Sequence, residues 1–313
     1  MTEVEQRFGK VLLFEPVYQT RVWGGRRLET LLGRKLPDDQ PYGESWELVD
    51  RAEAVSVVAE GPAKGMTLAE LWAGWRVQVW GAESLGWGRC PFPILIKVLD
   101  CKADLSLQVH PPASVAEELK GEPKTEMWYV AAAEAGSRLW VGLRDEVTKE
   151  RFEQGVREGT VADLVHVVEA HAGESLHVPS GRLHALGAGL LVYEVQQNSD
   201  TTYRVFDWNR VGLDGQPREL HIEQSLRCID FTDVRPGLQR KEREELISDC
   251  PAFRVKRRNH GMPSMLLALT EVIWDGVKVG QGRVAVRPAA LPPVEPVGEW
   301  LEITLPNPDP IHG

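Results

Sequence analysis

Two histidines, one glutamate and one glutamine have the types and strand positions that a divalent metal ion requires. Gln108 and His110 are two residues apart in Leu105–His110, whose other face is apolar, so both side chains leave the predicted strand by the same face. Glu126 begins another predicted strand, and His184 follows a Pro-x-Gly turn. Two imidazoles, one carboxylate and one amide oxygen suit Zn²⁺ or another borderline divalent ion, with positions left for water or substrate oxygens.

The turn before His184 has a spacing that carries information of its own. Gly173, Pro179, Gly181 and His184 follow one another at the intervals of the second cupin motif. Gly173 would open a strand, Pro179 and Gly181 would reverse the chain, and His184 would start the returning strand. His177 lies on the outgoing strand, outside the motif, and we expect it to pack or to support a ligand.

The elements that must position these residues are predicted to be mostly strands. Short β-type segments, broken by Gly and Pro, recur through the chain, and they favour a β-sandwich or barrel with helices confined to insertions. The strands predicted around the candidate site are Ile94–Leu99, Leu105–His110, Met127–Ala131, Leu190–Gln196 and Thr202–Trp208.

Four helices are predicted in the insertions. Capping boxes at Thr67 and Ser114 predict helices over Thr67–Leu85 and Ser114–Lys120. Apolar spacing predicts two more, Thr148–Val156 and Thr160–Val168, on either side of a glycine.

The chain changes character near residue 235. Residues 231–249 are charged and contain Pro236-Gly237, which is typical of a linker. Strand patterns then resume at Phe253–Arg257, Met265–Thr270, Val277–Val279 and Leu301–Leu305. We therefore predict a catalytic domain over residues 1–235 and a smaller β domain over residues 236–313.

Composition excludes several classes of partner. The 313 residues include 36 basic and 46 acidic ones, a net charge of −10, which argues against nucleic acid and anionic membranes as main partners. No apolar run approaches the length of a membrane span, and the polar N-terminus has no signal-peptide core. The four cysteines are widely spaced without a CxxC pair, which predicts reduced thiols in a cytoplasmic protein.

Several stretches together resemble the type I mannose-6-phosphate isomerases, or phosphomannose isomerases, in their short bacterial form. They are RVWGGRRL (21–28), YGESWEL (42–48), FPILIKVLDCKADLSLQVHP (92–111), KTEMWYV (124–130) and VPSGRLHALGAGLLVYEVQQNSDTTYRVFDWNR (178–210). The last stretch is highly specific. After residue 231 the resemblance is limited to position and strand-rich character.

The resemblance implies a cupin, that is, a jelly-roll β-barrel catalytic domain, followed by a smaller C-terminal β domain of cupin-like character. It implies an enzyme that interconverts mannose 6-phosphate and fructose 6-phosphate through a cis-enediol(ate). The partner would be a phosphorylated sugar, and the protein would be a monomer or homodimer. One Zn²⁺ per chain would be held by Gln108, His110, Glu126 and His184.

The resemblance also suggests roles for other residues. Arg204, in TTYRVFDW, would belong to the active site, and Lys124 is a candidate acid/base, or else a charged residue that binds phosphate or hydroxyl groups. Glu194 is another candidate base, or else a hydrogen-bonded strand carboxylate. We expect Arg204, Lys97 and Ser106 to bind the phosphate group of the substrate. Lys97 interrupts an apolar strand and should therefore point into a polar cavity, and Ser106 shares a face with the predicted ligands.

Two departures from the family pattern stand out. The acidic residues usual after the His-Pro are replaced by Pro112-Ala113-Ser114, which predicts an altered turn without loss of metal. Pro123 replaces the histidine that precedes the active-site lysine in longer members, so no acid/base role carries over to that position.

Two other functions fit part of the pattern. Two histidines and a carboxylate could form the facial triad of an Fe(II) oxygenase, although Gln108 would fill a fourth position. A non-catalytic cupin could bind sugar or metal, but it would not need Lys124 and Arg204 beside an intact ligand set. Metal analysis together with an oxygen-uptake assay distinguishes an Fe(II) oxygenase from a zinc isomerase. Sugar binding without isomerase activity would identify the non-catalytic cupin.

Overall fold

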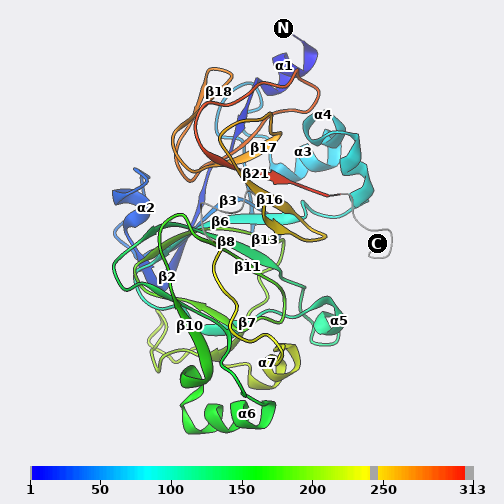
Figure 1. The fold of residues 1–313 in the computed structure, drawn as a ribbon. Coiled ribbons are helices and arrows are strands. Elements are labelled where there is room, and N and C mark those ends of the chain that lie inside the picture. Colours follow the sequence, from blue (N-terminus) through cyan, green and yellow to red (C-terminus); the bar gives the residue numbers. More distant parts are fainter. Residues whose placement is uncertain (1, 240–245, 307–313) are drawn as a thin grey trace.

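The computed structural model describes residues 2–239 and 246–306, and two β-sheets face each other at its centre (Figure 1). The larger sheet has the strand order β11 (Ser175–Val178), β8 (Glu126–Ala133), β13 (Leu190–Gln197), β6 (Ile94–Cys101), β3 (Tyr42–Leu48) and β2 (Val17–Gly25). The smaller sheet has the order β10 (Val165–Glu169), β9 (Arg138–Leu143), β12 (His184–Leu186), β7 (Leu107–Val109) and β14 (Tyr203–Phe206). Trp128 and Val192 of the first sheet pack with Leu139 and Leu186 of the second in one buried cluster. The predicted all-β fold with inserted helices is confirmed.

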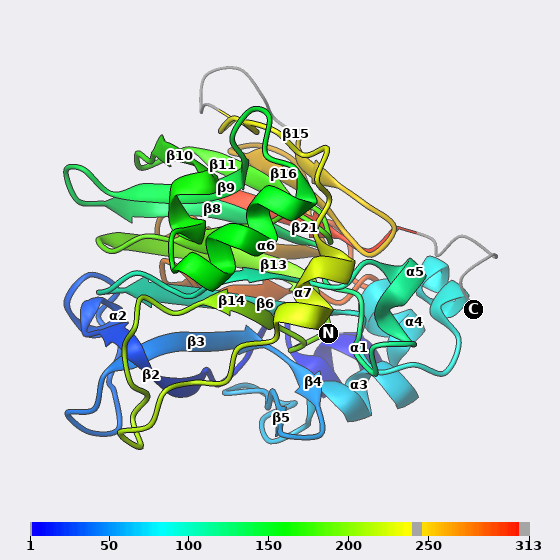
Figure 2. The same cartoon turned by 90° about the horizontal axis from the view of Figure 1, so that it is seen from below.

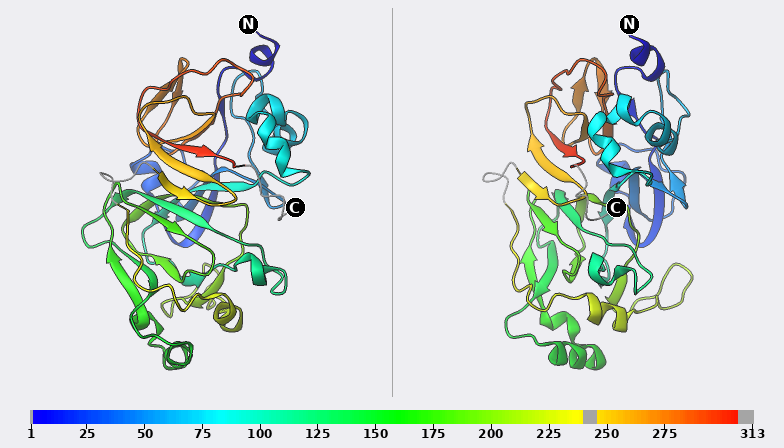
Figure 3. Two further views of the ribbon diagram at one scale, coloured as in Figure 1. Left: turned by 45° about the vertical axis from the view of Figure 1, so that its right-hand side comes forward. Right: turned by 90° about the vertical axis from the view of Figure 1, so that its right-hand side faces the viewer.

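A third sheet covers the outer face of the larger sheet (Figures 1 and 3). Its order is β1 (Leu12–Leu13), β20 (Val284–Val286), β17 (Met265–Ala268), β21 (Trp300–Thr304), β16 (Arg254–Arg258) and β15 (Leu246–Asp249). Along β13, Tyr193 and Val195 pack toward this sheet, whereas Val192 joins the core between the first two sheets. Because both faces of β13 are buried, the strand begins with the apolar run Leu190–Tyr193.

The third sheet is built from both ends of the chain, since β1 pairs with β20 in register Leu12↔Val286. Two further sheets have two strands each. In one, β4 (Asp50–Arg51) pairs with β5 (Ala54–Val55), and in the other, β18 (Val272–Trp274) pairs with β19 (Val277–Val279). The division into two domains at residue 235 stays a prediction.

Helices cover the outer face of the five-stranded sheet. α6 (Lys149–Glu158), the 3₁₀ helix η2 (Val161–Leu164) and α7 (Ile222–Cys228) lie against it (Figure 2). Thr148 caps α6 through its side chain, and Gly159 ends the helix in the left-handed conformation, as the sequence indicates. Two short helices, α1 (Glu3–Phe8) and α2 (Arg27–Thr30), lie near the N-terminus.

The predicted helix over Thr67–Leu85 begins correctly but is not continuous. Thr67 and Glu70 form the expected capping box. The segment then divides into α3 (Leu68–Gly74), α4 (Arg76–Trp80) and the 3₁₀ helix η1 (Ala82–Trp87). Gly81, with φ 85°, separates the last two, because that backbone conformation cannot continue an α-helix.

Three other predictions are wrong in part. The helix α5 (Ala113–Ala116) starts after Pro112 with no side-chain cap, so the capping box at Ser114 does not form. The predicted helix Thr160–Val168 is only η2 and then strand β10, because pairing with β9 overrides its helical apolar spacing. The linker predicted over 231–249 ends in strand β15; its residues 240–245 lie outside the described residues.

Within residues 2–239 and 246–306, we find no helix that combines the length and apolarity needed to cross a membrane.

The third sheet is expected to be essential for stability. Phe253 is fully buried in the core between this sheet and the larger one. We predict that Phe253→Ala lowers the free energy of unfolding by about 3–5 kcal/mol, because it leaves a cavity in that core. Val297, 72% exposed, is the control: Val297→Ala should change the free energy by about 0.5 kcal/mol or less. Urea denaturation measures both, and equal values would mean that the interface adds little.

Candidate active site

Three of the four predicted metal ligands form a compact buried group. His110, Glu126 and His184 each offer one ligand atom, and these atoms lie within 4.8 Å of one another. Nε2 of His110 is 3.1 Å from Oε1 of Glu126, and Nε2 of His184 is 3.9 Å from Oε2. His110 directly follows β7, and the other two residues begin β8 and β12.

The turn between β11 and β12 brings these residues together. Gly181 has φ 91°, a conformation that favours glycine, and its amide donates to the carbonyl of His110 at 2.9 Å. Beyond the turn, His184 is in register with Gln108 of β7. The Pro-x-Gly turn therefore places His184 at the start of the returning strand, beside Gln108, as the sequence indicates.

Backbone carbonyls fix the orientation of both imidazoles. Nδ1 of His110 is 2.8 Å from the carbonyl of Thr201, and Nδ1 of His184 is 2.8 Å from that of Arg182. Because a carbonyl only accepts, Nδ1 carries the proton and Nε2 presents its lone pair toward Glu126. Burial lowers the pKa of His110 and lowers that of His184 to about 3, so both rings are neutral near pH 7.

Glu126 is held as a carboxylate. Burial alone would raise its pKa, but Lys124, whose Nζ donates to Oε1, and then His110 hold the pKa well below its usual range. Oε2 of Glu126 is buried and has no hydrogen-bond partner among the described residues. A buried carboxylate oxygen without a partner, 3.9 Å from Nε2 of His184 in a group that also contains His110, fits a divalent cation.

Gln108 lies beside the same group. Its Nε2 is 3.4 Å from Nε2 of His184, and its Oε1 accepts a hydrogen bond from Oγ of Ser106 at 3.1 Å. The Ser106 hydroxyl can also accept, so the amide can turn Oε1 toward the histidines and keep a bond to Ser106. The structure thus brings together all four predicted ligands.

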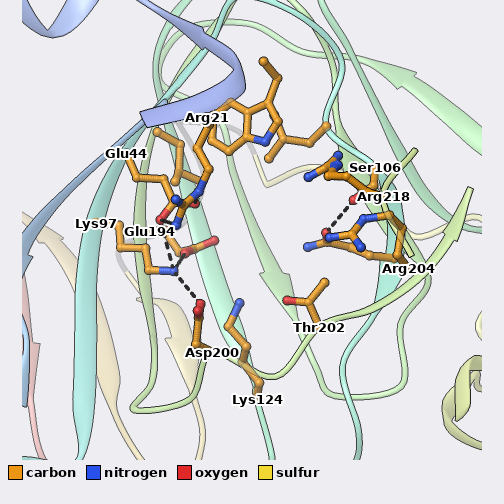
Figure 4. A pocket seen from close by; sticks show the side chains of 14 residues that line it. Arg21, Glu44, Lys97, Ser106, Lys124, Glu194, Asp200, Thr202, Arg204 and Arg218 are labelled. Carbon is orange, nitrogen blue, oxygen red and sulfur yellow. Dashed lines mark hydrogen bonds and ion pairs between the residues drawn. The ribbon is translucent and has the colours of Figure 1, made fainter. Parts of the chain in front are cut away.

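A cavity of about 310 Å³ opens beside this group (Figure 4). Every predicted catalytic or substrate-binding residue lines it, as do Gln108 and five polar residues that sequence reasoning did not assign to the site. The polar lining consists of Arg21, Glu44, Lys97, Ser106, Gln108, Lys124, Glu194, Asp200, Thr202, Arg204 and Arg218.

One end of the cavity is rich in carboxylates. Nζ of Lys97 lies 3.7 Å from Glu44, 3.9 Å from Glu194 and 3.7 Å from Asp200. Glu44 also accepts from Arg21, and although burial opposes it, Lys97 and Arg21 lower the pKa of Glu44 to about 2. Lys97 points into the cavity as expected, but it lies across the cavity from Arg204 (Figure 4).

The pKa values of Glu194 and Lys124 are both raised, but for different reasons. Burial and then Glu126 raise the pKa of Glu194 to about 7, against Lys124 and Lys97. Its Oε2 accepts from Nε1 of Trp128 at 2.9 Å, which fixes the carboxyl group. Burial would lower the pKa of Lys124, but Glu126 and Glu194 more than offset it and raise that pKa.

His177 lies outside the metal-ligand group. It sits on β11, and its Nδ1 is 2.7 Å from Oγ of Ser248 on β15 of the third sheet.

Some of the five additional cavity residues could have been predicted from the sequence, and others could not. Asp200 and Thr202 stand just before Arg204 in NSDTTYR, and strand alternation from Arg204 would have placed Thr202 on its face. Glu44 lies in YGESWEL, one of the stretches that resemble the family, but no role was predicted for it. Arg21 begins another such stretch, RVWGGRRL, whereas Arg218 has no local signal, because only the fold brings it to the cavity.

A His–Glu–His group at the ends of strands, between two facing β-sheets, is a candidate metal site in a cupin-like fold. Known proteins make the class more specific. Residues 11–134 match the family model described as "Phosphomannose isomerase type I, catalytic domain". The chain is 35% identical to mannose-6-phosphate isomerase ManA of Bacillus subtilis over 281 residues, which are 87% of each chain. It is also 35% identical to the mannose-6-phosphate isomerase of Streptococcus mutans over 282 residues, which are 88% of this chain and 87% of that one. The crystal structure of the mannose 6-phosphate isomerase from Bacillus subtilis superposes with a TM-score of 0.79 at 28% identity, covering 94% of this chain and 98% of that one. The chain belongs to the type I phosphomannose isomerase family.

Proposed function

We propose that this chain is a zinc-dependent aldose–ketose isomerase that interconverts mannose 6-phosphate and fructose 6-phosphate through a cis-enediol(ate). The observation that carries the proposal is the buried group of His110, Glu126 and His184 beside a cavity with five cationic side chains. A phosphorylated sugar is an anion of suitable size for such a cavity. The names of the relatives support the same substrate.

The donor set supports zinc as the metal. His110, Glu126, His184 and Gln108 would hold the ion, with two neutral imidazoles, a carboxylate and an amide oxygen. When bound, such an ion supplies Lewis-acid stabilisation for the negative charge that develops on the sugar oxygens.

We assign proton transfer between the two adjacent sugar carbons to Glu194. Its carboxyl group lines the cavity, is held by Trp128 and has a pKa of about 7, near the value that suits a general acid/base at neutral pH. Lys124, paired with Glu126, suits its alternative role as a charged residue that binds substrate oxygens. Arg204 and Ser106 would bind the phosphate.

Three further properties stay predictions: one Zn²⁺ per chain, a cytoplasmic location, and a monomeric or homodimeric state.

The conversion of mannose 6-phosphate is the test of this proposal. We expect the purified protein to form fructose 6-phosphate in a coupled assay, and in D₂O to incorporate deuterium at carbon 1 of the fructose 6-phosphate formed, because the proton removed from carbon 2 exchanges with solvent before a proton is returned to carbon 1 of the enediol. Glucose 6-phosphate is the control substrate and should give little product. Absence of conversion by zinc-loaded protein would reject the proposed function.

A further inference from the structure

At the end of the cavity that contains Arg204, cations line the wall without a carboxylate among the lining residues. Nη1 of Arg204 donates to the backbone carbonyl of Glu219 at 2.8 Å, a neutral partner. Its Nε is buried and has no hydrogen-bond partner within the described part of the chain. Arg218 lies beside Arg204, together with Ser106 and Thr202, across the cavity from Glu44 and Lys97 (Figure 4).

We propose that Arg218 is a second arginine that binds the substrate's phosphate group, and that Asp207 is the positioning residue that holds its guanidinium. This inference rests on the proposed function for the identity of the substrate, but not for the anion site itself.

Asp207 holds Arg218 in a fixed orientation. The Asp207 carboxylate is buried and accepts from Nε of Arg218 at 2.7 Å and from Nη2 at 2.5 Å. This two-point contact orients a planar guanidinium more strictly than a single bond does. No described residue is recorded as a partner of the remaining nitrogen, Nη1, and the side chain lines the cavity. Nη1 is therefore available to an anion.

Asp207 also binds Arg210, so its single charge is shared. Nε and Nη2 of Arg210 donate to Oδ1 of Asp207 at 3.0 and 2.8 Å, and Nη1 donates to the carbonyl of Asp104. Two guanidinium groups thus share one carboxylate, which leaves one positive charge unbalanced, and Arg204 adds a second cation near them. Burial, and next the nearby charge of Arg218, lower the pKa of Arg204, although the Asp207 carboxylate opposes the shift.

The backbone after Asp207 takes a costly conformation to build this arrangement. Trp208 and Asn209 are consecutive non-glycine residues with φ of 56° and 54°. The turn is held down by Trp208, whose Nε1 donates to the carbonyl of Leu105 at 2.6 Å. The chain then reverses, with Gly212 donating to the carbonyl of Gln216 at 2.7 Å, and returns Arg218 to Asp207.

The test compares Arg218→Gln, Arg218→Lys and Asp207→Asn with the control Arg151→Gln, which removes a surface cation from α6. Calorimetry with inorganic phosphate measures anion binding directly. We expect Arg218→Gln to raise the Kd by about 10- to 100-fold, Asp207→Asn and Arg218→Lys to raise it by about 3- to 30-fold, and Arg151→Gln to leave it unchanged.

Kinetics separate a binding role from general damage. For mannose 6-phosphate, KM should rise with the phosphate Kd in Arg218→Gln and Asp207→Asn, while kcat stays within about threefold. For unphosphorylated mannose, kcat/KM should not change.

An unchanged phosphate Kd in Arg218→Gln, or no measurable phosphate binding by the wild-type protein, overturns the inference. If Asp207→Asn does not fold, the two Arg218 variants decide. A wild-type protein that binds phosphate through Arg218 but converts no mannose 6-phosphate would reject the proposed function and leave the anion site standing.

Discussion

Replacing His184 with alanine is expected to abolish metal retention and to lower isomerase activity at least about a thousand-fold. The substitution removes an imidazole whose Nε2 faces Glu126 and whose Nδ1 is fixed by the carbonyl of Arg182. A catalytic metal contributes several kcal/mol to the transition state, and about 4 kcal/mol corresponds to a thousand-fold in rate. Elemental analysis of the purified variant and the coupled assay measure the two effects.

The matched control is His177→Ala, seven residues earlier. That variant loses a bond of 2.7 Å to Ser248 but keeps the whole ligand group. We expect normal metal content, normal activity and a loss of about 1 kcal/mol of stability. Normal metal content in His184→Ala, or loss of metal in His177→Ala, would mean that the ligand assignment is wrong.

Replacing Glu194 with glutamine is expected to lower kcat by about 10²- to 10⁴-fold without loss of metal, which is the usual contribution of a general acid/base. Glutamine keeps the shape and can still accept from Trp128, but it cannot exchange a proton. Glu158→Gln, on the surface of α6, is the control for loss of one carboxylate and should leave kcat unchanged.

The same variant gives a signature in the pH profile. The carboxylate must be ionised to accept a proton, so in the wild type kcat/KM should fall as the pH decreases through the pKa of Glu194, about 7 in the absence of metal. A cation beside Glu126 would move that limb to lower pH, since positive charge favours the ionised form. In Glu194→Gln the limb should disappear. If the rate and the limb both persist, proton transfer belongs to another group, and Lys124 is the next candidate.

Site residues that belong to a local sequence pattern could be predicted, whereas residues placed only by the tertiary fold could not. His184, Gln108 and His110 are recognisable because strand alternation and a Pro-x-Gly turn are local features with fixed geometry. The strands around them are correct in the structure apart from small shifts at their ends. Arg218 was not predictable, because its place depends on a loop that reverses after a strained turn and on a carboxylate eleven residues earlier.

Failures elsewhere have the same cause. The segment Thr160–Val168 has helical spacing of apolar residues, yet half of it pairs with β9, and only the tertiary fold provides that partner. Lys97 was correctly expected to face a polar cavity, since a charge in an apolar strand needs one. Its three carboxylate neighbours come from separate segments, so their convergence could not be read from the sequence.

The third sheet now has a structural explanation. The strands that carry Glu126 and Glu194 present their opposite side chains, such as Met127 and Tyr193, to this sheet. Those apolar side chains would otherwise face water. The C-terminal strands therefore stabilise the scaffold that positions the site.

The proposed isomerase activity depends on a metal held by the His110–Glu126–His184 group. The direct measurement is the rate of fructose 6-phosphate formation from mannose 6-phosphate by the native protein, by the same protein after chelation, and again after zinc is returned. We expect chelation to lower the rate at least about a hundred-fold and zinc to restore it. Full activity in protein shown by elemental analysis to be free of metal would contradict the account.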